Sequence, residues 1–364
     1  MNTILKLEHI QKYYGNEGNI TKAIKDISFS VEAGEFLGIM GASGSGKTTL
    51  LNCISTIDTV SAGHIFLDGT DITEIKPKSL ARFRRENLGF IFQDFNLLDT
   101  LTISENIALA LAINKVPAGS VESRILDIAG KLNISDILNK YPYQVSGGQK
   151  QRVAFARALA PNPNLLLLDE PFAAIDAKVR QELRSWLKDM IERLGVTSIF
   201  VTHDQSEAIE VADEIIITNK GRIEQIGSPI DIYQHPDTAF SASFFGQTTT
   251  LDDYTKFKTF DVVDNVDRAV IRPEFVKVTK LSETTAQKAS VSVGEVVKTS
   301  FRGDNIEIAV KCDGGTVYAY RGLDETPITV GEKVNVFLYR LFITKGDEVQ
   351  ILRNKSLQEE SVII

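Results

Sequence analysis

A glycine-rich string is the first stretch of this sequence whose residue types could do chemistry. It reads GASGSGKT and runs from Gly41 to Thr48. Glycines at this spacing let the backbone turn tightly, so its N–H groups point at phosphate oxygens, and the helix that follows adds its positive N-terminal end. The lysine can reach the β- and γ-phosphates, and the threonine hydroxyl can ligate magnesium. We assign the nucleotide contacts of this string and of the residue after it to Gly41, Ser43, Gly44, Ser45, Gly46, Lys47, Thr48 and Thr49.

Two adjacent carboxylates end a second string, LLLLDE, at Asp169 and Glu170. The leucine run predicts a buried strand, so the carboxylates stand at its C-terminal end. Asp169 suits magnesium, directly or through water. Glu170 points differently and suits the attacking water, as general base or orienting group. Two structural carboxylates that cap a strand are the plainer alternative.

A histidine follows another apolar run in the string SIFVTHD. From this place the His203 imidazole can donate to the γ-phosphate and stabilise the charge that develops in the transition state. The other three histidines have no such setting. We expect them on the surface or in packing positions: His9, His64 and His235.

A serine followed by two glycines opens a predicted helix in the string VSGGQKQRVAFARAL. Ser146, Gly147, Gly148 and Gln149 would make a second anion site from backbone amides, a hydroxyl and a helix N-terminus. One nucleotide has no evident use for two such sites from one chain. The economical interpretation is that this site closes over the nucleotide of a second copy, in a two-fold dimer that shares two nucleotides.

The elements that position these groups alternate between apolar runs and amphipathic helical stretches, an α/β pattern, over residues 1–235. A helix from Lys47 through Cys53 should follow the glycine turn, and the pattern is helical from Asp94 to Tyr143, so we place an inserted helical subdomain at about 94–160. The predicted strands are Phe36–Met40, Leu88–Phe92, Leu165–Asp169, Ser198–Thr202 and Glu214–Thr218.

After a predicted linker helix at 236–247, the sequence changes to alternating, β-rich segments separated by glycine turns. We expect an all-β, barrel-like second domain at 248–355 and a frayed tail at 356–364. The segments that carry this expectation are VSVGEVVKTSF, NIEIAVKC, TVYAYRGL and KVNVFLYRLFITK.

The composition limits the possible partners. At 364 residues the chain is comfortable for two domains, and 43% hydrophobic with 24% charged residues is typical of a globular protein. A net charge of −8 argues against broad nucleic-acid binding. No apolar run is long enough to span a bilayer, no secretory signal is visible, and two lone cysteines, Cys53 and Cys312, make no disulfide framework. We therefore expect a cytoplasmic protein whose membrane role comes through a partner.

In order and spacing, the four strings resemble the ATP-binding subunit of an ABC transporter, over about two-thirds of the chain. The resemblance implies an α/β P-loop NTPase (RecA-like) cassette with a helical subdomain, followed by a small all-β OB/TOBE-like barrel. It implies ATP and Mg²⁺ as cofactors and a homodimer, or paired cassette, on integral-membrane permease subunits. A substrate-binding protein would join through the complex, and the subunit would lie on the inner face of the cell membrane.

Further site residues follow from the resemblance alone. Gln93, after LGFIF, would contact magnesium and the attacking water, and would move with the segment that touches the membrane subunit. Asp176, in AAID, matches the segment that crosses the dimer interface, and Tyr14, in KYYG, would stack on adenine. IRPEFVKVT, at Ile271 to Thr279, looks like the characteristic strand of the importers' C-terminal β-domain.

The two parts of the cassette resemble different subfamilies. Residues 1–115 look like lipoprotein-release and bacitracin-resistance exporters, whereas the chain from Tyr141 looks like importers of sulfate, molybdate, spermidine or maltose. DEPFAAID is nearest to the sulfate type, so we favour import of an oxyanion such as sulfate, with an exporter-type ATPase as the alternative.

Two alternative functions belong to other classes of protein. A soluble ABC protein that acts on ribosomes or DNA usually has two cassettes or long coiled-coil inserts, and this chain has neither. An anion sensor would use the β-domain as its binding part, with Arg302, Gly303 and Asp304 as a weak candidate site in a turn.

Overall fold

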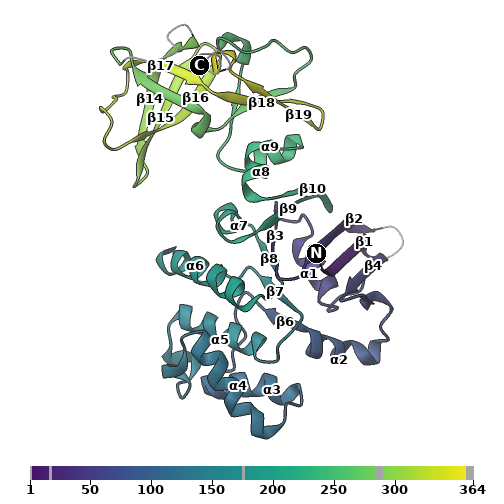
Figure 1. Ribbon diagram of the computed structural model, residues 1–364. Coiled ribbons are helices and arrows are strands. Elements are labelled where there is room, and N and C mark those ends of the chain that lie inside the picture. The colour runs from purple at the N-terminus through teal and green to yellow at the C-terminus, as the bar shows by residue number, and fades with distance from the viewer. Residues whose placement is uncertain (1, 16–18, 174–176, 284–289, 358–364) are drawn as a thin grey trace, which may run out of the picture. The chain divides into compact units, whose positions relative to one another are not determined.

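The computed structural model describes residues 2–15, 19–173, 177–283 and 290–357 of the chain. It divides into two compact units, Met1–Ile230 and Asp231–Ile364 (Figure 1). The segment 236–247, predicted as a linker helix, therefore belongs with the second unit.

The first unit is built on a ten-stranded sheet with the order β5-β4-β1-β2-β10-β9-β3-β8-β7-β6. All five strands predicted from apolar runs are present, as β3, β6, β7, β8 and β9. The strands are β1 (Thr3–Tyr14), β2 (Thr21–Glu32), β3 (Phe36–Gly41), β4 (Ala62–Leu67), β5 (Thr70–Asp71), β6 (Leu88–Ile91), β7 (Leu165–Asp169), β8 (Ser198–Thr202), β9 (Glu214–Asn219) and β10 (Arg222–Gly227).

Five neighbouring strands, β9-β3-β8-β7-β6, run parallel to one another. All residues of β3 and β8 are buried, as expected for strands covered on both faces. In register, Met40 lies beside Thr202, and Asp169 lies beside Val201. The carboxyl ends of β3, β7 and β8 therefore meet at one edge of the sheet, where ligands of open α/β sheets bind.

The remaining strands pair antiparallel, except that β10 lies parallel to β2. Along β1 and β2, buried residues alternate with more exposed ones. The two longest, β1 and β2, pair with each other, and β1 also pairs with β4. Their apolar faces, which include Leu5, Leu7, Ile24 and Ile27, share one core with β3, β7, β8 and helix α1. The antiparallel strands thus pack against the strand-turn-helix unit that carries the glycine string.

Three helices of the first unit, α3, α4 and α5, pack on one another and gather at one end of that unit (Figure 1). Thr102 begins α3 with a capping box, in which Glu105 donates its backbone N–H to Thr102 and accepts from it in return. No helix in the described part of the chain has both the length and the apolar character needed to cross a membrane. The helices of the first unit are α1 (Lys47–Ile54), α2 (Pro77–Asn87), α3 (Ile103–Ile113), α4 (Ala118–Lys131), α5 (Gly147–Leu159), α6 (Ala177–Leu194) and α7 (Gln205–Val211), and α8 (Pro229–Gln234) spans the boundary.

The second unit consists of a four-stranded sheet, β11-β12-β18-β19, a five-stranded sheet, β13-β17-β14-β15-β16, and the short helix α9 (Ala239–Phe244). Residues of both sheets share one hydrophobic core, consistent with a small all-β, barrel-like domain. Its strands are β11 (Thr249–Leu251), β12 (Arg268–Ile271), β13 (Val276–Lys280), β14 (Ser292–Phe301), β15 (Asn305–Cys312), β16 (Gly315–Gly322), β17 (Lys333–Leu338), β18 (Arg340–Lys345) and β19 (Glu348–Arg353).

Two predicted segments are each broken into two strands. IRPEFVKVT is not one strand: it contains the end of β12, a 3-10 turn at Pro273–Phe275 and most of β13. KVNVFLYRLFITK breaks at Tyr339, whose N–H donates to the Phe275 carbonyl and whose carbonyl accepts from Asn354. These bonds end β17 in one sheet and let β18 begin in the other.

Arg272 is the largest fully buried side chain in the described part of the chain, with 0% exposure. Its guanidinium donates to the backbone carbonyls of Tyr233 and Ala242, and it lies 4.2 Å from the ring centroid of Tyr233 and 4.9 Å from that of Phe342. Burial lowers the pKa of Arg272 to about 10. This one side chain joins α8 and α9 to the core of the second unit, which explains why both sheets and α9 form one body.

Candidate active site

The glycine turn between β3 and α1 owes two of its glycines to close backbone contacts. A Cβ on Gly41 would lie 2.1 Å from the carbonyl oxygen of Thr218, and one on Gly46 would lie 2.6 Å from that of Ala23. Gly44 faces open space, but its φ of +75° is a conformation that other residues rarely adopt. The sequence therefore folds here into a tight turn that leads directly into the helix N-terminus.

Lys47 lies folded over this turn. Its Nζ donates to the carbonyl oxygens of Gly41 (2.9 Å) and Ala42 (3.1 Å), and the residue is only 8% exposed. Burial lowers the pKa of Lys47, while the nearby carboxylates of Glu170 and Asp169 act in the opposite direction. The ammonium group is held at the turn where phosphate oxygens are expected.

The hydroxyl residues of the turn differ in how far their side chains are exposed to a ligand. Ser43 and Thr48 are exposed, and Thr49 is half-buried. Ser45 is 2% exposed, and its hydroxyl bonds to the Thr218 hydroxyl at 2.9 Å. The Ser45 side chain therefore serves the fold, and a contact from this residue to a nucleotide would fall to its backbone.

The carboxylate pair stands at the end of β7, beside the glycine turn. The pKa of Asp169 is raised by burial and by the charge of Glu170, and Lys47 partly offsets this. Glu170 has a φ of +46°, a strained conformation for a residue with a side chain, held by its N–H bond to Val201 (3.0 Å).

Glu170 and His203 contact each other across the ends of β7 and β8. The distance between Glu170 Oε1 and His203 Nδ1 is 3.0 Å. Since Nδ1–H donates to the carboxylate, Nε2 remains for a second partner. The His203 side chain is 66% exposed, so this second nitrogen can be reached from solvent.

Two residues assigned through the resemblance lie at different edges of the unit. Gln93 is exposed and comes two residues after β6, whose last residue, Ile91, lies beside Leu168 of β7. Tyr14 is 41% exposed, donates its hydroxyl to Asp58 at 2.6 Å and has the ammonium of Lys12 4.9 Å from its ring centroid. Burial and the bond to Asp58 raise the pKa of Tyr14. Its ring is thus fixed in place while much of it remains exposed.

The serine-glycine string begins α5 with a capping box. Ser146 Oγ accepts from the Gln149 N–H at 3.3 Å, and the Gln149 side chain accepts from the Ser146 N–H at 3.0 Å. A Cβ on Gly148 would lie 3.2 Å from Val179 of α6, so this glycine lets two helices approach. A Cβ on Gly147 would meet nothing within 4 Å in the described part of the chain.

The structure thus brings Lys47, Asp169, Glu170 and His203 together at one sheet edge. Gln93 follows a strand that ends at the same edge, whereas Ser146 and Gly147 lie apart at the N-terminus of α5. Asp176 lies outside the described residues. The capping box was missed at the sequence level, although the spacing of Ser146 and Gln149 signals one.

The candidate anion site at Arg302 is not supported. The Arg302 guanidinium pairs with the buried carboxylate of Glu307 at 2.8 Å, and Gln247 donates to the other oxygen of Glu307 at 3.3 Å. An anion at this turn would compete with Glu307 for the guanidinium and would be repelled by the charge of that carboxylate.

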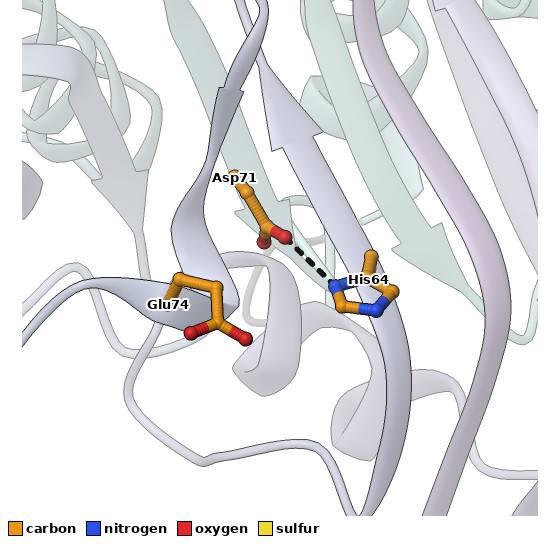
Figure 2. Close-up of side chains that lie close together, drawn as sticks. All are labelled: His64, Asp71 and Glu74. Carbon is orange, nitrogen blue, oxygen red and sulfur yellow. Dashed lines mark hydrogen bonds and ion pairs between the residues drawn. The ribbon is translucent and has the colours of Figure 1, made fainter.

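A second cluster, His64, Asp71 and Glu74, lies on β4, β5 and the turn that follows them (Figure 2). Its potential metal-ligating atoms lie within 4.8 Å of one another, and His64 Nδ1 is 2.7 Å from Asp71 Oδ2. His64 and Glu74 are exposed. Because the bond to Asp71 accounts for the position of His64, we assign no function to this cluster.

Comparison with known proteins places these features in a family. Residues 24–173 match the family model described as ABC transporter, and residues 269–338 match that of the TOBE domain. The chain is similar to the sulfate/thiosulfate import ATP-binding protein CysA of Gloeobacter violaceus, with 43% identity over 67% of this chain and 68% of that one. CysA of a Synechocystis species is 38% identical over 318 residues, 86% of each chain.

Solved structures agree with the fold of the first unit. The ATP-binding cassette MJ0796, in a dimeric post-hydrolysis state bound to ADP and Pi, is 35% identical over 62% of this chain and 99% of that one, with a TM-score of 0.55. The cbiO1 protein from Clostridium perfringens, part of the ABC transporter complex cbiONQ, is 29% identical over 65% of this chain and 92% of that one, with a TM-score of 0.59. The exporter-like resemblance of residues 1–115 finds no support in these comparisons.

Proposed function

Because the chain belongs to the ATP-hydrolysing subunits of ABC transporters and carries a TOBE domain, we propose that it powers the import of sulfate or thiosulfate. The observation that carries this substrate is the similarity to CysA of Synechocystis. Its 318 aligned residues exceed the 230 residues of the first unit, so the similarity extends into the second. The substrate class thus has support from both parts of the chain.

The arrangement of the site supports a division of roles in ATP hydrolysis. The amides of the glycine turn and Lys47 bind the phosphates, and Tyr14 stacks on adenine. Glu170 orients or deprotonates the attacking water. His203, with Nδ1 bound to Glu170 at 3.0 Å, uses Nε2 to stabilise the charge on the γ-phosphate.

A magnesium ion fits the residues assigned to it. Thr48, Gln93 and Asp169 supply hydroxyl, amide and carboxylate oxygens, the hard ligands that Mg²⁺ prefers. Asp169 is partly buried next to Glu170, and its raised pKa marks a carboxylate whose negative charge lacks full compensation. A dication there would supply that compensation and neutralise phosphate charge.

We also propose that two copies pair around two ATP molecules. Gly147 is exposed, and neither its conformation nor its neighbours in the described part of the chain require a glycine. A phosphate of the partner's nucleotide, approached by Ser146 and the α5 N-terminus, supplies the missing reason. Asp176 and Gln149 would join this interface.

The pair would sit on integral-membrane permease subunits at the inner face of the cell membrane, and a substrate-binding protein would deliver the oxyanion to them. The Gln93 segment, exposed after β6, is the part of the first unit proposed to respond to the permease. Closure on ATP and reopening after hydrolysis would move the permease.

Uptake of radiolabelled sulfate and thiosulfate tests the proposal. Deleting the gene in its own host should abolish uptake of both. The wild-type gene should restore it, Glu170→Gln should not, and His64→Ala should, since His64 has no assigned role. Unchanged sulfate and thiosulfate uptake in the deletion strain would exclude this substrate class. It would not contradict the assignment of ATP hydrolysis to the chain.

A further inference from the structure

The loop that carries His203 is fixed by a buried glutamate that has no part in the proposed chemistry. Glu207, on α7, is 4% exposed. It accepts a hydrogen bond from the hydroxyl of Thr202 at 2.5 Å, and Thr202 is itself only 1% exposed. A carboxylate is rarely buried unless a specific contact requires it.

The Thr202 hydroxyl connects this glutamate to the residue on the other side of His203. While it donates to Glu207, it accepts from the N–H of Asp204 at 3.0 Å. Asp204 in turn caps α7, since its Oδ1 accepts from the N–H groups of Ser206 (2.8 Å) and Glu207 (3.4 Å). The backbone on both sides of His203 is therefore tied to one buried hydrogen-bond network.

Charges from α6 surround the same network. Arg180 Nη1 lies 3.9 Å from Asp204 Oδ2, and both Arg180 and Arg184 act on the Glu207 carboxyl. Burial is the largest influence and raises the pKa of Glu207, and the charge of Asp204 acts in the same direction. The bond from Thr202 and the charges of Arg180 and Arg184 lower this pKa. The glutamate is thus held by specific partners against the cost of burial.

Among the described residues, Glu170 is the one hydrogen-bond partner of the His203 side chain. Its side chain is 66% exposed, and its contact to Glu170 joins it to a group that must be free to act on water. We propose that Glu207 is a positioning residue for ATP hydrolysis, which, through the Thr202 hydroxyl, fixes the backbone that presents His203 to the γ-phosphate. This inference rests on the role assigned to His203 in the proposed function.

The inference predicts a loss of kcat without a loss of ATP binding. Glu207→Ala should lower kcat about tenfold or more, because a displacement of about 1 Å at a reacting group has effects of this size. KM for ATP and the affinity for a fluorescent ATP analogue should change less than about twofold, since Glu207 lies behind the loop. Glu207→Gln keeps an acceptor oxygen and the volume, and should recover most of kcat.

Thr202 provides an independent route to the same hydrogen bond. Thr202→Val should lower kcat as Glu207→Ala does, and Thr202→Ser should not. The double variant Thr202→Val/Glu207→Ala should be no slower than the slower single variant, because both remove one network. Glu210→Ala is the matched control and should retain wild-type kcat. Glu210 lies on the same helix as Glu207, is exposed and pairs with Arg184 of α6.

His203→Ala, measured in parallel, separates the possible failures. If it lowers kcat while folded Glu207→Ala and Thr202→Val do not, this inference fails and the proposed function stands. If His203→Ala leaves kcat unchanged, the role of His203 fails and the inference fails with it. Additive losses in the double variant, or a Glu207→Gln variant as slow as Glu207→Ala, would also overturn it. Where Glu207→Ala does not fold, Thr202→Val and Glu207→Gln decide.

Discussion

The chain contains two glycine turns, each with a hydroxyl residue and a helix N-terminus. The two turns differ in whether contacts within the chain explain their glycines. In the turn at 41–48, Gly41 and Gly46 are required by carbonyl groups of the same chain, and Lys47 folds back onto the turn. In the turn at 145–149, a Cβ on Gly147 would meet none of the described residues within 4 Å, and Ser146 is exposed. One turn is completed by its own chain, whereas the composition of the other is not explained by any residue that the structure describes.

This difference distinguishes a residue that serves the fold from one that serves a partner. A glycine with positive φ or a crowded Cβ position is explained locally. Gly147 has neither feature, so the reason for it lies outside the described part of the chain. Three predictions test this contrast, beginning with the largest expected effect, and a fourth tests the carboxylate beside the first turn.

Changing Glu170 to glutamine should lower ATP turnover roughly 10²- to 10⁴-fold while ATP binding remains, because an amide keeps the shape but cannot take a proton. The variant should also accumulate as a dimer with MgATP, since ATP then joins the two turns without being consumed. Lys47→Ala differs: it should lose roughly 10- to 100-fold in ATP affinity and form no ATP-dependent dimer. ATPase rate, nucleotide affinity and size-exclusion mass check both; a Glu170→Gln chain that stays monomeric where the wild type closes would contradict this role.

Replacing Ser146 by arginine should abolish hydrolysis while the isolated monomer binds ATP normally, because this serine serves the partner's nucleotide. Mixed dimers with a Lys47→Ala chain should recover activity. One composite site then combines an intact glycine turn with an intact Ser146, and the other site lacks both. If Ser146→Arg weakens monomer binding as strongly as Lys47→Ala does, the site is not shared between chains.

Two neighbouring glycines offer a finer comparison. Gly147→Ala should leave the free energy of unfolding unchanged or raise it by about 0.4–1 kcal/mol, because the helix accepts alanine there without contact. It should still lower hydrolysis roughly tenfold, through the partner's nucleotide. Gly148→Ala is the control: its Cβ would press on Val179, so its main effect should be on stability. Thermal unfolding and ATPase rates of both variants check this, and full activity in Gly147→Ala would refute the contrast.

The smallest effect concerns Asp169, whose pKa is raised in the folded protein by burial and by Glu170. A raised pKa means that the folded state binds the proton more tightly, so this group favours folding at low pH and loses that contribution as pH rises through its folded pKa. Asp169→Asn should therefore raise Tm at neutral pH by roughly 2–4 °C while hydrolysis is lost. Asp127→Asn, at an exposed pair with Lys131, should not raise it. A lower Tm in Asp169→Asn would show that the charge of Asp169 does not destabilise the folded protein.

The parts predicted correctly from sequence are those in which local pattern and environment agree. Buried parallel strands appear as short apolar runs, so β3, β6, β7, β8 and β9 could be located, and the strand-turn-helix around Lys47 follows from its glycines. ATP hydrolysis and the family followed from the order of the strings. The individual site assignments remain predictions that the variants above address.

What the sequence did not predict depends on partners that are distant along the chain. The division of KVNVFLYRLFITK depends on bonds from Tyr339 to Phe275 and Asn354, and no local pattern marks them. Likewise, Ser45 bonds to Thr218 and Arg302 bonds to Glu307, so neither side chain is as available as its motif suggested. Tertiary contacts decide which polar groups remain available for a ligand.

The buried Arg272 has a consequence for how this protein can be divided or recombined. A chain cut at residue 247 would keep α9 but lose the guanidinium that lies 4.2 Å from the ring of Tyr233 and bonds to Ala242. In such a fragment the backbone carbonyls of Tyr233 and Ala242 would lose the Arg272 donor. A cut after Ile230 keeps Tyr233, Ala242 and Arg272 in one fragment, although it divides α8 after its second residue. For domain exchange between related subunits, the transferable segment begins at Asp231, well before its first β-strand.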